Sequence, residues 1–151
     1  MPSLFLSYSR EDLPLIQQLE ARLKEHPDLS IWGDQEKIYG GQKWPKLLGE
    51  AIADQDVFLL AWSRNAAASH LVEFEWMMAL ALKQPVILCL LDSTPLPALL
   101  GSIHTIAISD VAEVVSAITS SSLMHDTDHR EEVISLLDQM TAARPGDVLN
   151  A

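Results

Sequence analysis

One glutamate in this chain stands where an ionised side chain is costly. The segment 69–82 is almost wholly apolar, yet it contains Glu75. This glutamate shares one stripe of a 3.6-residue helical period with three apolar residues, Leu71, Met78 and Leu82. The carboxylate should therefore point inward or along the wall of a cleft. An ionised carboxylate in such a place is unfavourable unless it is used, so Glu75 is the first candidate for a catalytic group.

Polar and aromatic side chains also follow three predicted strands. They are Ser7, Tyr8, Ser9 and Arg10 after the first strand, Asp34 and a loop through Gly40 and Gly41 to Trp44 after the second, and Trp62, Ser63 and Arg64 after the third. Ligands of open parallel sheets bind outside the carboxyl ends of the strands. These aromatic faces, hydroxyls, guanidinium groups and backbone N–H donors suit a nucleotide better than a simple metabolite.

The elements that must position these residues alternate between strand and helix. Short apolar runs indicate strands buried on both faces, with a weaker fifth at the end: 4–8, 29–32, 57–62, 86–91 and 103–108. Helical patterns lie between them, from residue 13 to 23, 44 to 53 and 69 to 83, and a closing helix covers 111–122. This alternation predicts a doubly wound α/β sandwich with a parallel sheet.

Local signals agree with these boundaries. Asp12 is placed to cap the first helix, with Pro14 in its first turn, and Ser69 to cap the helix that carries Glu75. Pro85 is expected to end that helix, and two prolines break regular structure within 92–101.

The predicted domain covers residues 1–122. Residues 123–151 are interpreted as a polar linker with a short amphipathic helix, leading to a further domain that is not in this chain. Two histidines and two aspartates within 125–129 have ligand chemistry for zinc. Because they lie in a polar hinge without a rigid frame, a solvated linker is the favoured interpretation.

Composition limits the classes of function. The chain has 151 residues, of which 48% are apolar, and its net charge of −11 comes from 21 acidic and 10 basic residues. That charge opposes binding to nucleic acid or to anionic membranes. Without a basic leader or an apolar run near the roughly 20 residues that span a bilayer, we expect a soluble cytoplasmic protein. The lone Cys89 lies in a buried-strand pattern, which predicts an inert core thiol.

Two alternatives with similar folds are excluded by their missing residues. A phosphoacceptor receiver domain needs clustered acids after the first strand and an aspartate at the end of the third, where this chain has Ser7 to Ser9 and Trp62. A phosphate loop of the Walker type is absent because Gly33, Gly40 and Gly41 lack its spacing and its Lys-Ser/Thr pair.

Four motifs in order resemble the TIR (Toll/interleukin receptor) domain family over about residues 3–120. Residues 4–12, LFLSYSRED, resemble its first box, and IWGD at 31–34 with IYGGQKW at 38–44 resembles its second strand and BB loop. Residues 48–56 are similar to the helix before its third strand, and Ser69-x-x-Val72-x-x-Glu75 is similar to its Ser-x-x-Cys-x-x-Glu helix. The resemblance implies the TIR fold, a flavodoxin-like sandwich with a five-stranded parallel sheet and helices on both faces.

The resemblance also implies an activity. Many TIR domains cleave NAD⁺ between nicotinamide and ribose with an essential glutamate, and the aligned residue here is Glu75. The expected products are nicotinamide and either ADP-ribose or a cyclic isomer, with NAD⁺ as substrate and no cofactor or metal. Ser9, Arg10, Asp34, Trp44 and Ser69 are the expected substrate-binding residues. Self-association through the BB loop would switch on an effector of immune defence or cell death.

The chain departs from the family pattern at Leu71 and Val72, where many relatives have an aromatic residue and a cysteine. Trp44 or Trp62 is then the remaining source of ring stacking on nicotinamide. The final strand lacks the Phe-Trp box of animal receptor TIR domains, which favours a prokaryotic-type or divergent member.

Alternatives stay open for each residue. Glu75 has two alternatives, a helix carboxylate turned to solvent or a structural salt bridge such as one to Arg10, and Glu73 is the rival carboxylate on the opposite side of the helix. Ser69 has capping alone as its alternative, and Trp44 has a core anchor.

Ser9 and Arg10 have plain turn or surface roles as alternatives, and Asp34 has a role in a turn or in a salt bridge of the BB loop. For the whole chain, the alternatives are a non-catalytic TIR–TIR interaction module and, third, a nucleoside-processing transferase in which the pocket glutamate is a covalent nucleophile.

Overall fold

A computed structural model of the chain describes residues 2–32, 44–124, 135 and 138–139. Within these residues the strands form one parallel sheet in the order β2-β1-β3-β4-β5. Their bounds are β1 Ser3–Ser7, β2 Ser30–Trp32, β3 Val57–Trp62, β4 Val86–Leu90 and β5 Thr105–Ala107. The predicted doubly wound α/β sandwich and its five-stranded parallel sheet are confirmed.

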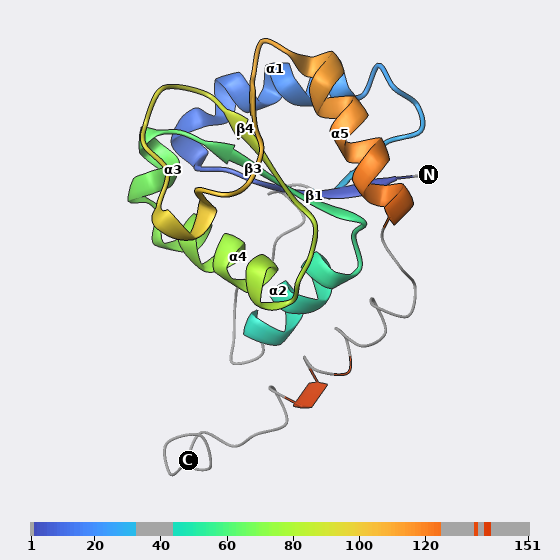
Figure 1. The fold of residues 1–151 in the computed structure, drawn as a ribbon, viewed down its shortest axis with the longest axis vertical. Coiled ribbons are helices and arrows are strands. Elements are labelled where there is room, and N and C mark those ends of the chain that lie inside the picture. Colours follow the sequence, from blue (N-terminus) through green and yellow to red (C-terminus); the bar gives the residue numbers. More distant parts are fainter. Residues whose placement is uncertain (1, 33–43, 125–134, 136–137, 140–151) are drawn as a thin grey trace.

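Helices cover both faces of the sheet. In Figure 1, α1 (Leu13–Leu23) and α5 (Val111–Met124) lie together on one face, and α2 (Trp44–Ala53) and α4 (His70–Ala81) lie on the other. Each helical layer has its own cluster of buried apolar side chains against the sheet. A short helix, α3 (Arg64–Ala68), precedes α4, and single 3₁₀ turns form η1 (Arg10–Asp12) and η3 (Ala98–Leu100).

The central strands explain why the apolar runs are continuous. All six residues of β3 are buried, because this strand pairs with β1 on one side and β4 on the other and has helices over both faces. Phe5 of β1 stacks on Phe58 at 5.3 Å and on Trp32 at 4.9 Å between ring centroids. The expectation that the second strand is buried on both faces is wrong. Strand β2 lies at the sheet edge, with Ser30 exposed and Ile31 and Trp32 half-buried.

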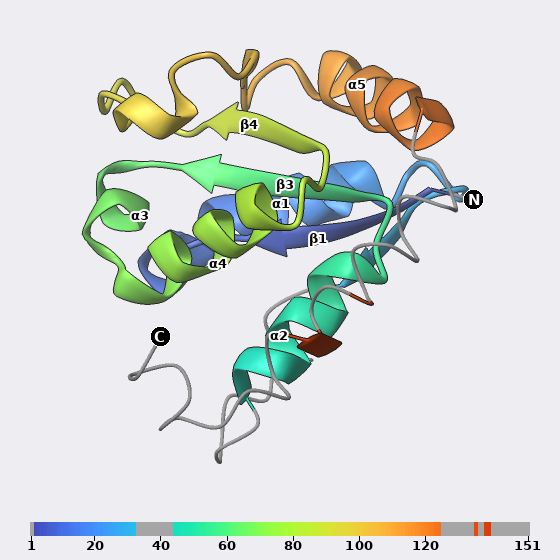
Figure 2. The same ribbon diagram turned by 60° about the horizontal axis from the view of Figure 1, so that its bottom comes forward.

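The strand order reverses direction between β1 and β3. From β1 the chain goes outward to β2 and then returns past β1 to β3, so the loops after β1 and β3 leave the sheet in opposite directions. In this strand order ligands bind at that point of reversal, beyond the carboxyl ends of the strands. Figure 2 shows the arrowheads of β3 and β4 pointing to the end of the molecule where α3 lies.

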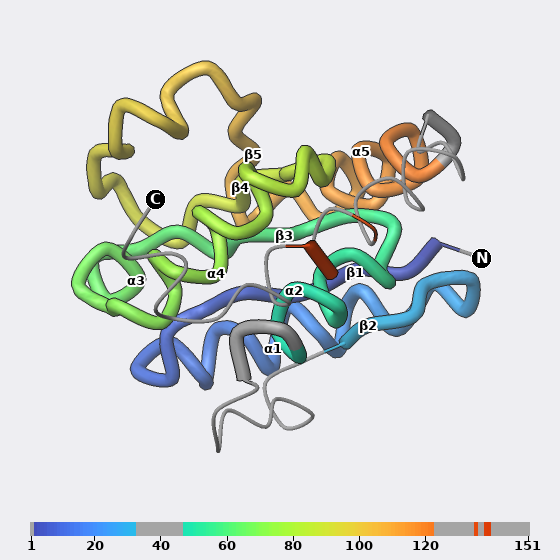
Figure 3. The backbone as a smooth tube through the Cα atoms, turned by 90° about the horizontal axis from the view of Figure 1, so that it is seen from below, coloured from blue at the N-terminus to red at the C-terminus, as the bar shows by residue number. Residues whose placement is uncertain are grey.

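The chain makes a long excursion between β4 and β5, drawn in yellow in Figure 3. It contains Pro95 and Pro97 and the 3₁₀ turn η3, as the predicted break in regular structure requires. None of the described helices is both long enough and apolar enough to cross a membrane. The predicted linker helix and the histidine–aspartate cluster within 125–129 fall largely outside the described residues.

Both ends of α4 are capped. The Ser69 Oγ accepts a hydrogen bond from the Val72 N–H at 3.2 Å, which confirms the predicted N-cap. At the other end Lys83 adopts a left-handed conformation with φ of 57°. The Lys83 N–H donates to the Leu80 carbonyl at 3.1 Å and the Gln84 N–H to the Ala79 carbonyl at 3.0 Å, the bonding pattern of a Schellman motif. The helix therefore ends at Ala81, before Pro85 could stop it.

We predict that Lys83→Gly gives a more stable protein than Lys83→Ala. Both variants lose the lysine side chain, but only glycine adopts the left-handed conformation without a steric cost from Cβ. The expected difference in free energy of unfolding, measured by urea denaturation, is about 1 kcal/mol. Equal stability of the two variants would contradict this account of how α4 ends.

Candidate functional site at the carboxyl end of the sheet

Glu75 lies on the buried side of α4, next to the end of β1. Its side chain has 0% exposure, and its Oε1 accepts a hydrogen bond from the Ser7 Oγ at 2.8 Å. Ser7 is the last residue of β1 and is also 0% exposed. The inward direction predicted from the helical stripe is confirmed, and the carboxylate lies beside the strand that borders the reversal of strand order.

Asp12 connects the two loops that diverge there. Its carboxylate accepts hydrogen bonds from the Ser63 hydroxyl and, at 2.7 Å, from the Asn65 side chain. Asp12 is buried, and its two partners begin α3 after β3. The prediction that its side chain caps the first helix is wrong: it occupies the N-cap position but forms no cap hydrogen bond. The two side-chain donors across the sheet edge hold the carboxylate instead.

The other predicted substrate-binding residues lie near the same edge or outside the described part. Ser9 is 7% exposed, and its hydroxyl accepts from the Glu11 N–H at 3.3 Å as the cap of η1. Arg10 follows it and is exposed. Ser69 is half-buried at the N-cap of α4. Asp34 is outside the described residues, and Trp44 begins α2 with a side chain that is not described.

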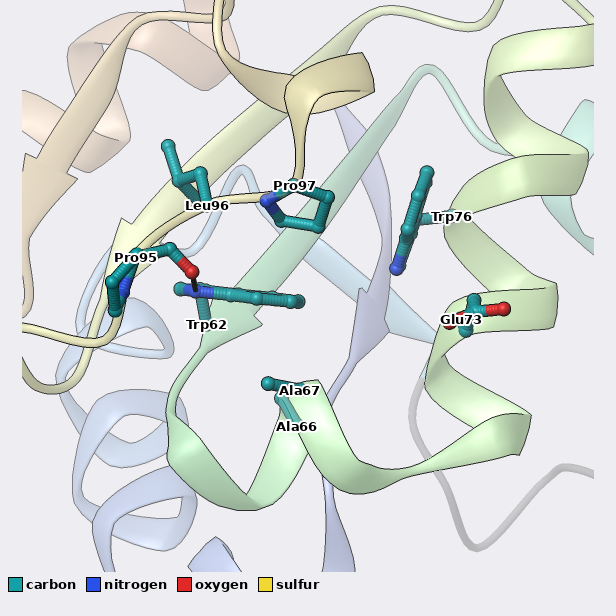
Figure 4. Close-up of a pocket in the computed structure, with 8 residues that line it drawn as sticks. All are labelled: Trp62, Ala66, Ala67, Glu73, Trp76, Pro95, Leu96 and Pro97. Atoms are coloured by element: carbon teal, nitrogen blue, oxygen red, sulfur yellow. Dashed lines mark hydrogen bonds between the residues drawn. The ribbon is translucent and has the colours of Figure 1, made fainter.

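A pocket of about 280 Å³ lies on another side of α4. We call it the tryptophan pocket; its walls are Trp62, Ala66, Ala67, Glu73, Trp76, Pro95, Leu96 and Pro97 (Figure 4). The indole N–H of Trp62 lies 3.2 Å from each of the Thr94 and Pro95 carbonyl oxygens, which fixes the ring against the proline-containing segment. The two candidate glutamates of α4 therefore lie in different places. Glu73 lines this pocket, whereas Glu75 is buried beside Ser7.

Asp92 holds the start of that segment. Its carboxylate accepts from the Arg64 N–H at 3.0 Å and from the Thr94 N–H at 2.9 Å. Hydrogen bonds from Thr94 and then from the Arg64 backbone lower the pKa of Asp92 below its ordinary value. The ionised carboxylate therefore joins the loop after β4 to the start of α3.

Cys89 is fully buried in β4, and burial raises the pKa of its thiol to about 11. The predicted inert core thiol is consistent with this environment, since a thiol with a raised pKa carries little of the reactive thiolate. Among the described residues, no three His, Cys, Asp or Glu side chains are grouped closely enough to hold a metal ion.

Sequence reasoning missed two roles at this edge. Ser7 was grouped with its neighbours after the first strand, but its direct bond to Glu75 depends on how α4 crosses β1. The position of Asp12 before the first helix predicts a helix cap. The local sequence does not show that its carboxylate instead accepts a hydrogen bond from Ser63, which is 51 residues away.

Comparison with known proteins identifies the family. The model of the TIR domain family matches residues 4–118, so the chain belongs to the TIR family. A comparison with curated protein sequences gave no significant match.

Solved structures share the fold at low identity. The TIR domain of the Toll-related receptor TRR-2 from Hydra magnipapillata has a TM-score of 0.61 and 13% identity, with 84% of this chain and 97% of that chain covered. The CMP N-glycosidase BcmB of Clostridium botulinum has a TM-score of 0.53 and 20% identity, covering 78% and 98%. The TIR domains of the activated Roq1 resistosome have a TM-score of 0.50 and 18% identity, covering 91% and 84%. At these identities the likeness shows the fold alone.

We predict that Asp12→Ala lowers the free energy of unfolding by about 2–3 kcal/mol, because two hydrogen bonds to a buried carboxylate are lost. The neighbouring Glu11→Ala is the matched control. Glu11 is exposed and, among the residues that the structure describes, offers only its backbone N–H to Ser9, so its replacement should change stability by about 0.5 kcal/mol or less. Urea denaturation measures both variants. A loss in Asp12→Ala no greater than in the control would show that the connection between the loops contributes no stability.

Proposed function

We propose that this TIR domain cleaves the bond between nicotinamide and ribose in NAD⁺, with Glu75 as the catalytic residue. The observation that carries the proposal is the carboxylate of Glu75, fully buried at the carboxyl end of β1 and held by the Ser7 hydroxyl at 2.8 Å. The position supports a functional role, because this edge of the sheet is where α/β folds bind ligands.

The chemistry suits a carboxylate. As the bond between nicotinamide and ribose breaks, its electron pair leaves with nicotinamide and positive charge develops at the anomeric carbon. Glu75 stabilises this oxocarbenium-like charge or holds the ribose hydroxyls. Water then adds to the anomeric carbon and loses a proton, giving ADP-ribose. A nucleophile of the same molecule, adenine or a ribose hydroxyl, would give a cyclic product instead.

Access to Glu75 is part of the proposal. A side chain with 0% exposure does not reach a substrate from solvent, so the site must open before NAD⁺ binds. Opening of loops around a site is a common step in enzyme cycles. We infer that self-association of TIR domains favours the open form, and that activity as an effector in immune defence or cell death follows assembly.

The comparisons support the proposal in two limited ways. One neighbour in fold is named as an N-glycosidase, and cleavage of NAD⁺ at nicotinamide breaks the same class of bond. Another neighbour is the TIR part of an activated resistosome, an assembled state.

A non-catalytic TIR–TIR interaction module is the second candidate. It is favoured by apolar side chains exposed on the outer side of the α2–α4 layer: Leu47 is 47% exposed, Phe74 37% and Met77 47%. In that function the bond between Ser7 and Glu75 is structural.

We predict that the wild-type domain, concentrated on beads, releases nicotinamide from NAD⁺ and that Glu75→Gln reduces release at least about 100-fold. Glutamine keeps the shape of the side chain but removes the charge. Nicotinamide is measured by chromatography, assembly by light scattering, and folding by melting temperature.

The control for this experiment is Glu113→Gln, an exposed glutamate of α5 on the other face of the sheet, which should retain activity. Loss of release in Glu73→Gln but not in Glu75→Gln would transfer the catalytic role to the rival glutamate. No release from assembled wild type would favour the interaction module. A trapped glycosyl-enzyme would indicate the transferase mechanism.

We further predict that Ser7→Ala lowers kcat about 10-fold or more with little change in KM, because Ser7 positions Glu75 and does not bind substrate. Ser7→Thr keeps the hydroxyl and should restore most of the activity. A defect in Ser7→Thr as large as in Ser7→Ala, with both proteins folded, would argue against positioning through the hydrogen bond.

A further inference from the structure

Helix α4 is apolar on nearly every side, since nine of its twelve residues are apolar. A helix of that composition is expected to be covered on all sides. Its inner side packs against the sheet, but on the outer side Phe74 is 37% exposed and Met77 is 47% exposed. Leu47 of α2, in the same helical layer, is also 47% exposed. We call these three residues the outer patch.

The chain beyond α5 contains a segment with one apolar side, residues 131–143, which we call the tail segment. The structure describes three of its residues, and all three are helical, polar and exposed: Ser135, Asp138 and Gln139. They stand at i, i+3 and i+4, which is one stripe of a helix. A period of 3.6 residues puts positions 133, 137 and 140 on the opposite side, where the sequence has Val133, Leu137 and Met140. The tail segment therefore has an apolar stripe opposite the stripe that meets solvent.

The described part of the tail segment lies beside the α2–α4 layer. Helix α5 ends at Met124, over the other face of the sheet. In Figure 1 residues 138–139, drawn in red, lie below α2, and Figures 2 and 3 also show them next to that helix. The chain thus changes from one face of the sheet to the other after α5, and reaches the layer that carries the outer patch.

We propose that the tail segment docks as a helix on the outer patch of its own chain, with Val133, Leu137 and Met140 turned toward the patch. Docking removes apolar surface of both partners from water. It also leaves the polar stripe of the segment in solvent, as the structure has it.

Attachment to the same chain favours this partner over a second copy. A segment on a short flexible linker is present at an effective concentration on the order of millimolar. Two copies of a chain with a net charge of −11 also repel each other. Docking occupies the surface that favours the interaction module, so it competes with association between copies. This competition rests on that second candidate function, whereas the docking itself does not.

Hydrogen exchange of the full chain, followed by mass spectrometry, tests the docking. The tail segment should be protected in the wild type, to the same extent at low and at high protein concentration. Leu137→Lys puts a charge on the apolar stripe and should speed exchange of residues 133–140 at least about 10-fold. Gln139→Lys adds the same charge to the exposed stripe, so it is the matched control and should exchange as the wild type does.

A second pair of variants locates the docking surface. Leu47→Lys combined with Met77→Lys charges the outer patch and should release the tail segment as Leu137→Lys does. The control, Leu15→Lys combined with Leu99→Lys, adds the same charge at exposed leucines outside the α2–α4 layer and should leave protection unchanged. 

Three results would each overturn the proposal: no protection in the wild type, unchanged protection in the patch variant, or protection that rises with protein concentration. The last of these would identify a second copy as the partner. Light scattering tests the competition separately, since Leu137→Lys should assemble at a lower concentration than Gln139→Lys. Equal assembly of the two would reject the competition, and the exchange rates would still decide the docking.

Discussion

Polar groups buried at one end of the sheet must find partners inside the protein, and this requirement shapes the whole carboxyl edge. Five of the six buried polar or charged residues in the described structure lie there, namely Ser7, Ser9, Asp12, Ser63 and Glu75. Each is bonded to another member of the edge or to a neighbouring backbone group. The sixth, Gln84, lies beyond the end of α4 and donates to the Ile52 and Gln55 carbonyls near the end of α2. Because an unpaired buried polar group costs about 1–3 kcal/mol, the paths of these loops are tightly coupled.

That coupling explains how α4 is positioned. Asp12 joins the loop after β1 to the start of α3, and Asp92 joins the start of α3 to the loop after β4. Helix α4 begins directly after α3, at Ser69. The direction in which α4 leaves the sheet edge is thus set by hydrogen bonds from both sides, and this direction decides which face of the helix meets Ser7. The tryptophan pocket depends on the same connections, since its proline-containing wall follows Asp92.

The sequence predicted the elements well where burial controls the pattern. The run 57–62 and the helix from Trp44 to Ala53 match the structure residue for residue, because a strand buried on both faces and an amphipathic helix each leave a clear apolar pattern. The run 29–32 predicts strand β2 at the correct position in the chain, but it does not predict that the strand is partly exposed. So short a run does not indicate whether a strand lies at the edge of a sheet.

Helix α3 was missed for a related reason. Its five residues, Arg64–Ala68, are too few to show a helical period. Ser63 caps it through a bond to the Ala66 N–H, but in the sequence the same residue suited a loop.

In the candidate site, too, local features could be predicted from the sequence and contacts between distant residues could not. The inward direction of Glu75 followed from helical periodicity, which is local, and the structure agrees with it. Its partner Ser7 is 68 positions away in sequence, and the partners of Asp12 are 51 and 53 positions away. Such pairings depend on the crossing of helix and strand, which no short segment specifies. The tryptophan pocket could not be predicted for the same reason, because its walls come from separate segments of the chain. Trp62 and Glu73 are each notable in the sequence, but nothing there indicates that they lie near each other.

The bond between Ser7 and Glu75 bears on the choice between an enzyme and an interaction module. A buried polar pair is a weak source of stability, because replacement of both partners by apolar groups of similar shape is often neutral or stabilising. Elsewhere the interior of this sheet consists of such apolar groups, including every residue of β3. A structural role alone would therefore be served as well by a leucine at position 75 facing an alanine. A carboxylate with a fixed donor has no such substitute when positive charge must be stabilised at an anomeric carbon, and this difference favours chemistry at Glu75.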